Sequence, residues 1–504
     1  MKFILCLILS ALGSLVVTAT FAAEGQQAKP NIVFILADDL GSGDLSCFGQ
    51  ERFRTPHIDQ VAAAGMRFTQ HYSGNAVCAP SRCVLMTGRH PGHAVVRNNR
   101  EAKPEGQFPL PAGTQTMARI LHDSGYATGA FGKWGLGGPE SEGAPLRQGF
   151  DRFFGYNCQR VAHNFYPPHL WDNEQRLLLD NAPFAAHQRL PAGADANDPS
   201  TYAPYSGKQY APQLIVEQAV QFIEQQREKP FFLFFPTTIP HLALQVPDKA
   251  LAEFAGKFEE EPYDGSRGYL PQRLPRAAYA AMVTQFDRDV GRLMAALDEQ
   301  QLSDNTIVII TSDNGPLYDR LGGTDTDFFQ SAGKLRGRKG SLFEGGIRVP
   351  LVVRWPARIA ADAQSARVTG FEDWLPTLLE LAGLPKSAPP EIDGISFAPT
   401  LWGETQPPRP FLYREFPAYG GQQAVRIGDW KGIRQGLMPG GKKGQPKLRI
   451  ALFNLREDPN ETTDVAAKHP DVVDKIARRM RSEHRPSADF PFPALDRLAG
   501  ESSE

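Results

Sequence analysis

Short apolar runs recur at wide intervals along the chain. They are NIVFILADD (31–39), YATGAFGKW (126–134), PFFLFFPTTIPH (230–241) and TIVIITSDNG (306–315). The first, third and fourth are continuous rather than alternating, which is typical of strands that are covered on both faces. The pattern therefore predicts parallel strands in the core.

Helical periodicity fills segments between those runs. In AAMVTQFDRDVGRLMAALDEQ, apolar residues recur at helical spacing; they are Met282, Phe286, Val290, Leu293 and Leu297. The run at 306–315 follows directly. Strands that alternate with helices predict an α/β domain with a mixed, mostly parallel sheet flanked by helices.

The pattern changes after DWLPTLLELAGLP (373–385). Pro-rich turns lead into AVRIGDWKGIRQG and LRIALFNLREDP, which predict a small antiparallel sheet. The segment PDVVDKIARRMRSEH (470–484) predicts a helix that closes this unit. We place a boundary near residue 405, with a large domain over 28–404 and a C-terminal α+β subdomain over 405–504. The tail from residue 485 is expected to be loosely held.

The first residues, 1–23, have the pattern of a secretory signal peptide. One Lys precedes an apolar run, and small residues follow near Ala22 and Ala23. A membrane anchor is the alternative, but the polar EGQQAKP comes immediately afterwards. No other segment has the long uncharged stretch that spanning a membrane needs, so we expect no stable membrane span. We expect a periplasmic or secreted protein.

Composition narrows the function classes only slightly. The 504 residues carry a net charge of -2, which argues against a nucleic-acid binder because such proteins usually have a basic stripe. Beyond Cys6 in the leader, four cysteines remain, which allow three disulfide pairings that the sequence cannot choose between; they are Cys47, Cys78, Cys83 and Cys158. Their spacing does not resemble a zinc site.

Oxygen ligands follow two of the predicted buried strands. Asp38 and Asp39 end the first run, and Asp313 and Asn314 follow the fourth. Ligands of open α/β sheets bind beyond the carboxyl ends of the strands. If the two strands are neighbours, three carboxylates and an amide oxygen converge, which favours Ca²⁺ or Mg²⁺. Either pair alone is more simply a polar turn.

The stretch CAPSRCVLMTG (78–88) contains the candidate nucleophile, Cys78. Pro80 suits the first turn of a helix, and a helix N-terminus favours an anionic ligand. Arg82 adds a planar cation. From spacing alone, a core or disulfide cysteine is the simpler interpretation.

Three more basic residues follow strand-like runs. Lys133 lies in FGKWGLG, His241 in PTTIPHLALQVP and Lys339 in LRGRKGSLFEGGIRVP. A lysine in a Gly-rich loop is usually a solvated surface residue. Together, however, cations beside a divalent metal suit an anionic oxyester.

These motifs identify a family resemblance. CAPSRCVLMTG is similar to the C-x-P-S-R-x-x-x-x-T-G signature of the type I, formylglycine-dependent sulfatases of the alkaline-phosphatase-like superfamily. Further similar blocks occur in the family's order: NIVFILADDLG, TPHIDQVAAAGMRFT, GYATGAFGKWGLG, QGFDRFFGY, TSDNG, KGSLFEGGIRVP, DWLPTLLELAG and LFNLREDPNE. The resemblance implies an alkaline-phosphatase-like fold, with 28–404 as the catalytic domain and sulfuric ester hydrolysis as its activity.

The resemblance also implies roles at the nucleophile. Cys78 would be oxidised by a maturation enzyme to formylglycine (3-oxoalanine), whose hydrate attacks sulfur. Arg82 would stabilise that hydrate, and His241, Lys133 and Lys339 would hold the sulfate oxygens. His241 or Lys339 would also protonate the leaving oxygen. Ca²⁺, with Mg²⁺ as the other possibility, would be bound by Asp38, Asp39, Asp313 and Asn314.

One position departs from the family's pattern. Many members have G-K-W-H-L-G, whose histidine is thought to assist release of sulfate, whereas this chain has Gly135 there. Solvent, a metal-bound carboxylate such as Asp313, or another base would then serve. His93 and His163 are the candidate substitutes, and each is equally well explained as a surface or core histidine.

Two loops are predicted to form the rim of the substrate pocket. They are GHAVVRNNR (92–100) and AHNFYPPHLWDN (162–173). Besides His93 and His163, their candidate substrate-binding residues are Arg97, Asn98, His169, Trp171 and Asp172. Each is equally well explained as an ordinary loop residue. The sequence as a whole resembles those of carbohydrate sulfatases that act on algal galactans or glycosaminoglycans.

Three functions therefore stay open from the sequence. The first is a sulfatase with a sulfated carbohydrate substrate, and the second is a phosphoesterase or phosphonate monoester hydrolase of the same superfamily. The third is an inactive carbohydrate-binding relative, for which Gly135 is the only hint. The sequence does not set the sugar, the ring position of the sulfate, endo or exo action, or the oligomeric state.

Overall fold

A large mixed sheet forms the centre of the computed structural model, which describes residues 29–438 and 445–500. In spatial order its strands are β12 (Ala363–Ser365), β2 (Met66–Tyr72), β11 (Arg348–Arg354), β10 (Thr306–Ser312), β1 (Asn31–Ala37), β9 (Phe231–Pro236), β5 (Ala127–Lys133), β6 (Arg152–Tyr156), β7 (His169–Asp172) and β8 (Gln175–Leu178). β13 (Thr369–Gly370) pairs with β2 in addition. The five strands from β10 to β6 are parallel to one another, whereas β11, β7 and β8 are antiparallel to a neighbour. The predicted mixed, mostly parallel sheet is confirmed.

The central strand β1 shows why its sequence is continuously apolar. Val33 and Ile35 lie in the core on one face of the sheet, and Ile32, Phe34 and Leu36 lie in the core on the other. All seven residues of β1 are buried. A strand with two covered faces needs apolar side chains on both of them, as the run from Ile32 to Ala37 provides.

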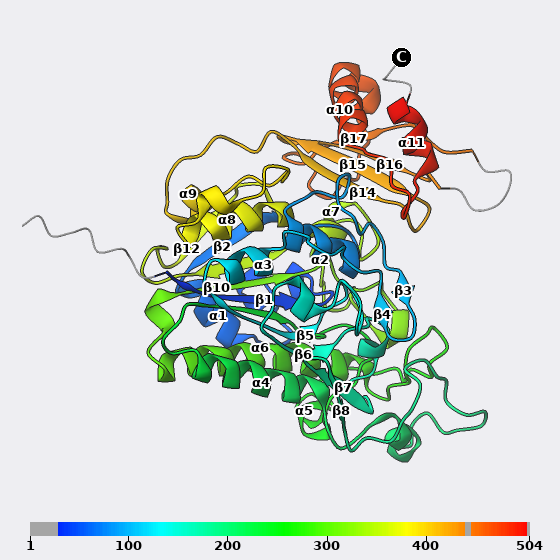
Figure 1. The fold of residues 1–504 in the computed structure, drawn as a ribbon. Coiled ribbons are helices and arrows are strands. Elements are labelled where there is room, and N and C mark those ends of the chain that lie inside the picture. Colours follow the sequence, from blue (N-terminus) through cyan, green and yellow to red (C-terminus); the bar gives the residue numbers. More distant parts are fainter. Residues whose placement is uncertain (1–28, 439–444, 501–504) are drawn as a thin grey trace, which may run out of the picture.

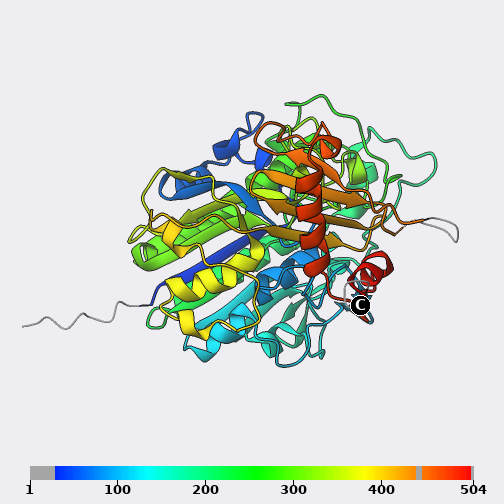
Figure 2. The same cartoon turned by 90° about the horizontal axis from the view of Figure 1, so that it is seen from above.

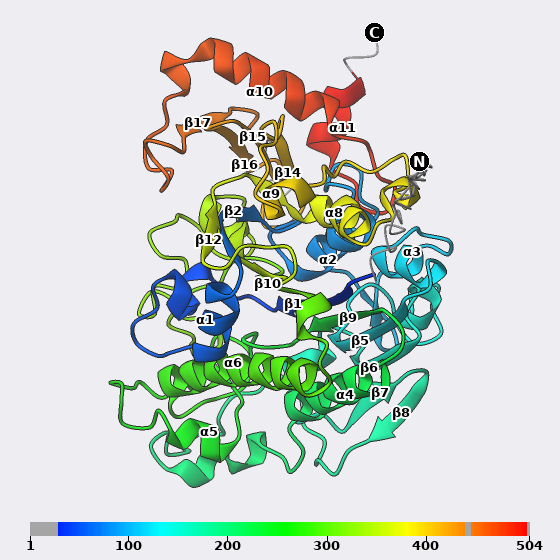
Figure 3. The ribbon, with the colours of Figure 1, turned by 90° about the vertical axis from the view of Figure 1, so that its left-hand side faces the viewer.

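Helices cover both faces of the sheet, as Figures 1 and 3 show. The core on one face includes residues of α1 (Pro56–Ala63), α4 (Ala211–Gln225), α5 (Asp248–Ala252) and α6 (Pro275–Glu299). The core on the other face includes residues of α2 (Cys78–Thr87), α3 (Met117–Asp123), α8 (Trp374–Leu381) and α9 (Ala398–Leu401). Shorter elements are the hairpin of β3 (Glu101–Ala102) and β4 (Gly106–Gln107), and α7 (Glu344–Ile347).

The C-terminal part forms a second, antiparallel sheet above the first one (Figures 1 and 2). Its strands are β14 (Leu412–Phe416), β15 (Gln422–Ile427), β16 (Trp430–Gln435) and β17 (Ala451–Asn454). One face packs against residues before α2 and around α7, including Ala76 and Val77. The other face is covered by α10 (Pro470–Ser482). The predicted sheet and closing helix are therefore present, while the exact boundary at residue 405 stays a prediction.

The tail after residue 485 is more ordered than its sequence suggested. It forms α11 (Pro493–Gly500), and Phe492 and Leu495 pack against Leu437 of the second sheet's connection. His484 Nε2 also lies 2.9 Å from Asp496 Oδ1. The expectation of a loosely held tail is wrong, because a few apolar residues within polar sequence are enough to bind it.

Two sequence predictions concern the chain ends and membranes. The predicted signal peptide, 1–23, lies outside the described residues. Within 29–438 and 445–500, the structure has no helix that combines the length and apolar character needed to cross a bilayer.

Candidate active site

Cys78 is the first residue of α2 and is 1% exposed. The preceding residue, Val77, is extended, so the helix begins at the cysteine itself. The next backbone N–H, that of Ala79, donates to Asn99 Oδ1 at 2.9 Å. The helix ends at Thr87 and is capped by Gly88, whose φ of +67° is a left-handed conformation that glycine adopts without strain. The sequence thus places the sulfur at the positive end of a buried helix.

The two predicted pairs of oxygen ligands lie side by side. β1 and β10 are parallel neighbours, and Ala37 is opposite Ser312 at their carboxyl ends. Asn314 Nδ2 donates to Asp39 Oδ1 at 2.6 Å, and the backbone N–H of Asp39 lies 3.3 Å from Asp313 Oδ1. Strand pairing therefore brings residues that are about 275 positions apart into one oxygen-rich site.

Each of three carboxylates has a basic partner. Lys133 Nζ lies 2.6 Å from Asp38 Oδ2, and Lys339 Nζ lies 2.8 Å from Asp39 Oδ2. Arg82 donates through Nε and Nη2 to Asp313 Oδ2 at 3.0 and 2.9 Å. All six side chains are buried.

The same groups surround the sulfur of Cys78. Lys133 Nζ, Lys339 Nζ and Asp38 Oδ1 lie 3.5, 3.6 and 3.5 Å from its Sγ. Two further contacts position the lysines. Gly132, with φ of +138°, lets β5 approach the carbonyl of Pro236, which a Cβ atom would meet at 2.0 Å. The backbone N–H of Gly340 donates to the carbonyl of Ala76.

His241 completes the site from the loop after β9. Its Nδ1 donates to the carbonyl of Leu242 at 2.6 Å, so its Nε2 faces the carboxylates, 3.4 Å from Asp39 Oδ2. The ring of His163 stacks on it at 4.7 Å with an angle of 11°. We call this set the nucleophile cluster; its members are Asp38, Asp39, Cys78, Arg82, Lys133, His241, Asp313, Asn314 and Lys339.

Burial and neighbouring charges set the protonation of the cluster. Burial disfavours the Asp38 carboxylate, but Lys133 and the other basic groups outweigh it and hold the pKa of Asp38 well below its usual range. Burial and the Asp38 charge together raise the pKa of Asp313 to about 6. Burial also raises the pKa of Asp39, and it raises the pKa of the Cys78 thiol to about 12. Burial penalises each charged form, and the balance of close charges decides the result.

The donor set of the cluster fits a hard divalent cation. Asn314 Oδ1 is a buried acceptor without a hydrogen-bond partner, and it lies among three carboxylates. A buried acceptor of this kind needs a partner. Ligand atoms of Asp38, Asp39, Cys78 and His241 also lie within 4.8 Å of one another. Carboxylate and amide oxygens are preferred by Ca²⁺ and Mg²⁺.

Of the seven predicted substrate-binding residues, only His163 contacts the nucleophile cluster in the structure. Arg97 is 4% exposed, and its Nη1 donates to Glu415 Oε1 at 2.9 Å. His93 Nδ1 lies 2.8 Å from Asp393 Oδ1. Asn98 Oδ1 accepts from the backbone N–H of Asn99.

The second predicted loop is also held by structural contacts. His169 Nε2 and Trp171 Nε1 both lie within 3.1 Å of the carboxylate of Glu105. Asp172 forms an ion pair with Arg152. That these two loops bind substrate stays a prediction: Arg97, His169, Trp171 and Asp172 have protein partners, and His93 has one at Nδ1 but none at its buried Nε2. Asn99, next to Asn98 in the same RNNR segment, accepts a hydrogen bond from the first turn of α2.

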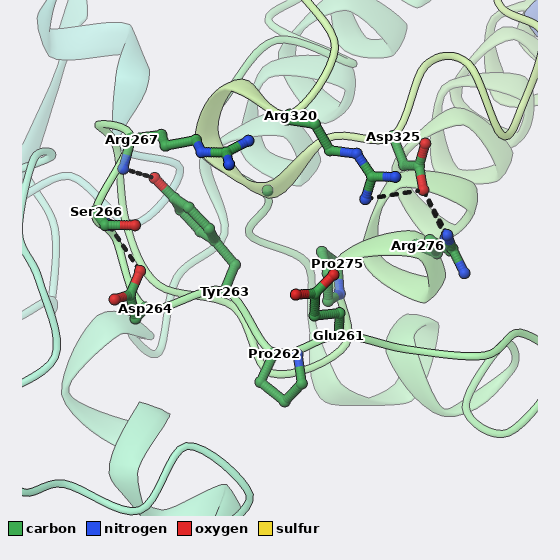
Figure 4. A pocket seen from close by; sticks show the side chains of 11 residues that line it. Glu261, Pro262, Tyr263, Asp264, Ser266, Arg267, Pro275, Arg276, Arg320 and Asp325 are labelled. Carbon is green, nitrogen blue, oxygen red and sulfur yellow. Dashed lines mark hydrogen bonds and ion pairs between the residues drawn. The ribbon is translucent and has the colours of Figure 1, made fainter.

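A separate pocket of about 470 Å³ is shown in Figure 4. Residues 261–267 form one side of it, and Arg276, Arg320 and Asp325 form the other. Asp325 Oδ2 lies 2.6 Å from Arg276 Nη2 and 3.3 Å from Arg320 Nη1. None of the residues that line this pocket belongs to the nucleophile cluster. The reaction centre is therefore not in this hollow, despite its size.

Comparisons with known proteins agree with this site. The model of the Sulfatase family matches residues 30–384, and that of the N-sulphoglucosamine sulphohydrolase C-terminal family matches residues 338–485. Mouse steryl-sulfatase is 30% identical over 97% of this chain and 88% of its own. An N-acetylgalactosamine-6-O-sulfatase of Bacteroides thetaiotaomicron is 30% identical over 91% of this chain and 94% of its own.

A solved structure extends the likeness to the fold. It comes from work on the metabolism of multiple glycosaminoglycans by Bacteroides thetaiotaomicron, with a TM-score of 0.70 and 28% identity. The match covers 90% of this chain and 99% of that one. The predicted family and activity are thereby confirmed: the chain belongs to the sulfatase family of the alkaline-phosphatase-like superfamily and is a sulfuric ester hydrolase.

Proposed function

We propose that this chain is an exported sulfatase that removes sulfate from a carbohydrate after Cys78 has been converted to formylglycine. The observation that carries the proposal is the position of Cys78. Its Sγ lies at the start of α2, between the Nζ atoms of Lys133 and Lys339 at 3.5 and 3.6 Å. Two cations and a helix N-terminus around one buried side chain suit an anionic substrate that must meet that side chain.

The formylglycine hydrate, once formed by a maturation enzyme, supplies an oxygen nucleophile at residue 78. The side chains of this chain then have separable tasks. Lys133 and Lys339 attract the sulfate oxygens and offset the charge that develops on them. Arg82, held by Asp313 at 2.9 Å, fixes the orientation of groups at residue 78. His241 Nε2 and Lys339 Nζ both lie beside Asp39 Oδ2, and either would hold the proton for the leaving oxygen.

Ca²⁺ is the metal that we propose, with Mg²⁺ as the other hard cation. Asp38, Asp39, Asp313 and Asn314 would hold it, and it would neutralise negative charge on substrate oxygens. The unpartnered Oδ1 of Asn314 supports this assignment.

The substrate class and the export are also part of the proposal. Carbohydrate is supported by two relatives, one named for N-acetylgalactosamine 6-O-sulfate and one solved in work on glycosaminoglycans. The steryl-sulfatase relative shows that the same family also accepts a different alcohol. Export is supported by the apolar leader at 1–23.

A direct test compares two aryl esters on the purified chain. We expect 4-nitrophenyl sulfate to be hydrolysed faster than 4-nitrophenyl phosphate, because the family match favours the sulfatase over the two alternatives. Mass spectrometry of the Cys78 peptide should show a residue lighter than cysteine in the active protein. Faster phosphate turnover, or full activity with an unmodified thiol, would overturn the proposal.

A panel of sulfated saccharides tests the substrate class. Release of sulfate from galactose 6-sulfate or N-acetylgalactosamine 6-sulfate, with none from a steryl sulfate, is the expected result. Activity on the steryl ester alone would contradict the carbohydrate assignment.

A further inference from the structure

A pocket of about 430 Å³ lies beside the nucleophile cluster. Its lining includes Asn99, Gln107, Gln159 and His163. Asn99 connects it to α2 through the backbone N–H of Ala79, and His163 connects it to the cluster through its stack on His241. A group that enters this pocket therefore lies next to the residues that would hold the sulfate.

The pocket contains two buried amide side chains with unused hydrogen-bonding atoms. Gln107 and Gln159 are each 4% exposed. Gln107 Oε1 and Gln159 Nε2 are buried and have no hydrogen-bond partner. An unpaired buried donor or acceptor costs stability, so two in one pocket indicate that a ligand supplies the partners.

Gly135 explains how the amide of Gln159 reaches this place. A Cβ atom at position 135 would lie 2.6 Å from Gln159 Nε2 and 3.2 Å from its Cγ. The Gln159 amide thus occupies the space next to residue 135 that a side chain there would use. Because Gly135 is only two positions after Lys133, the amide lies beside the loop that carries a cation of the nucleophile cluster.

The charges at this pocket balance one another. Glu101 Oε2 and Arg160 Nη1 both belong to lining residues and lie 3.7 Å apart. Their side chains are 40% and 66% exposed, so solvent screens the electric field that this ion pair exerts on the pocket. A balanced, solvated charge pair above two neutral amides favours an uncharged polar ligand over a second sulfate.

We propose that this pocket, which we call the amide pocket, binds the uncharged part of the sugar whose sulfate is removed. This inference rests on the proposed function and adds its specificity residues. Gln159 Nε2 donates to the ligand, and Gln107 Oε1 accepts from it. Ring hydroxyls and an acetamido group both combine an acceptor with a donor, so the ligand class is a neutral hydroxylated or N-acetylated pyranose.

The first experiment measures how Gln159→Leu and Gln107→Leu discriminate between substrates. We expect each to lower kcat/KM for a 6-sulfated galactose or N-acetylgalactosamine about tenfold, mainly through KM, since one neutral hydrogen bond is lost. Turnover of 4-nitrophenyl sulfate, whose aryl group has no such hydroxyls, should stay unchanged. Equal losses on both substrates, or no loss on either, would overturn the proposal.

Gln148→Leu is the matched control for loss of a buried amide. Gln148 is 1% exposed, has an unpaired Oε1 as well, and does not line the amide pocket. We expect it to change the unfolding midpoint without changing the ratio of the two activities. A shift of that ratio equal to that of Gln159→Leu would assign the effect to stability and refute the subsite.

A binding experiment separates this inference from the proposed reaction. In a Cys78→Ser background, calorimetry with galactose 6-sulfate and with N-acetylgalactosamine 6-sulfate needs no maturation and no turnover. Gln159→Leu should raise Kd about tenfold. A larger loss of affinity for the acetylated sugar identifies the acetamido group as the partner of Gln159, and equal losses identify a hydroxyl that both sugars share. Unchanged Kd values with both sugars refute the amide pocket. If binding depends on Gln159 but the unchanged chain with converted Cys78 hydrolyses no sulfate ester, the proposed function alone is refuted.

Gly135→Ala provides a second variant that leaves both glutamines in place. Its Cβ would displace the Gln159 amide, because the two atoms would be only 2.6 Å apart. The change also costs about 1 kcal/mol of stability, since φ at this position is +81°. We expect the same preferential loss on the sugar substrate as with Gln159→Leu, and no preferential loss would contradict the proposed position of the amide.

Discussion

The protein contains two buried clusters of acidic and basic side chains that are built differently. The second, which we call the Glu372 cluster, consists of Glu372, Asp373, Arg409 and Arg414. Arg414 donates to both oxygens of Glu372 at 3.0 Å, and Arg409 pairs with both acids. The remaining oxygen of Asp373 accepts from the backbone N–H of Gly370. Every carboxylate oxygen of the Glu372 cluster therefore has a partner within the protein.

The nucleophile cluster is not self-sufficient in this way. Burial opposes ionisation in both clusters, but two guanidinium groups hold the pKa of Glu372 at about 2. Each cluster also has an acid shifted the other way: burial raises the pKa of Asp373, and burial with the charge of Asp38 raises the pKa of Asp313 to about 6. The difference lies in hydrogen bonding, because the nucleophile cluster keeps an unpartnered oxygen on Asn314. Both clusters are buried, but the Glu372 cluster is complete within the protein, whereas the nucleophile cluster leaves a buried acceptor free for the ligands that we propose.

Cys78→Ala should produce the largest effect, because it removes the atom around which the nucleophile cluster is arranged. We expect hydrolysis of 4-nitrophenyl sulfate to fall to background while the unfolding midpoint stays close to that of the unchanged protein. Cys83→Ala is the control within the same helix: Cys83 is fully buried and should cost only about 1–2 kcal/mol of stability. Normal turnover by Cys78→Ala would remove the basis for treating this cluster as the reaction centre.

Asp313→Asn keeps the size of the side chain and removes a charge from the nucleophile cluster. Loss of a metal contact and of the Arg82 partner should lower kcat about 100-fold or more. Added Ca²⁺ should raise the thermal midpoint of the unchanged protein, since a ligand that binds the folded state stabilises it, and this increase should be lost in the variant. Asp373→Asn, in the Glu372 cluster, should keep the calcium response. An identical calcium response in both variants would contradict the assigned metal site.

Glu372→Gln should act on stability rather than on turnover. It leaves the buried guanidinium group of Arg414 without its charge partner and Arg409 with Asp373 alone, which costs about 3–5 kcal/mol. Denaturant unfolding should show this loss, and kcat per folded molecule should remain unchanged. A combined Glu372→Gln, Arg414→Met variant should recover part of the stability, whereas a fall in kcat of the folded protein would show that the two clusters are not separate.

Lowering the pH should also distinguish the Glu372 cluster as a source of stability, with a smaller effect on the free energy of unfolding. The pKa of Glu372 is lowered from 4.5 to about 2 in the folded chain, so its contribution is complete above pH 4.5 and is lost as pH falls towards 2. The shift corresponds to about 3 kcal/mol. Between pH 5 and 2, the unfolding free energy of the unchanged protein should fall more steeply than that of Glu372→Gln. Parallel curves would exclude Glu372 as a source of acid sensitivity.

Much of the nucleophile cluster could be predicted because its signals are local. Asp38, Asp39, Asp313 and Asn314 directly follow continuous apolar runs, and such runs become neighbouring buried strands. The helix at Cys78 is similarly encoded by a few adjacent residues. If β1 and β10 are neighbours, the general rule that ligand sites lie at the carboxyl ends of parallel strands brings these residues together.

The amide pocket could not be predicted in this way. Gln107 is at the end of a two-residue strand and Gln159 is in a loop, and their sequence surroundings carry no periodic signal. The ion pair of Arg97 could not be predicted for a related reason. Its partner, Glu415, is 318 positions away, so the sequence shows an exposed-looking arginine where the fold has a buried ion pair. Contacts of this range are decided by the tertiary packing of loops.

The burial of Cys78 has a consequence for the time at which its side chain can be altered. The segment just before it is closed by parts of the chain made much later: Asn75 Nδ2 donates to the carbonyl of Glu415, and Val77 packs with Leu412 and Phe416. Until the C-terminal sheet has been synthesised and docked, this segment lacks its cover. Biosynthesis therefore includes an interval in which the cysteine is not yet covered by the C-terminal sheet. Under the proposed function, conversion of the thiol must fall within that interval, and a chain that folds with an unaltered thiol stays inactive for as long as it remains folded.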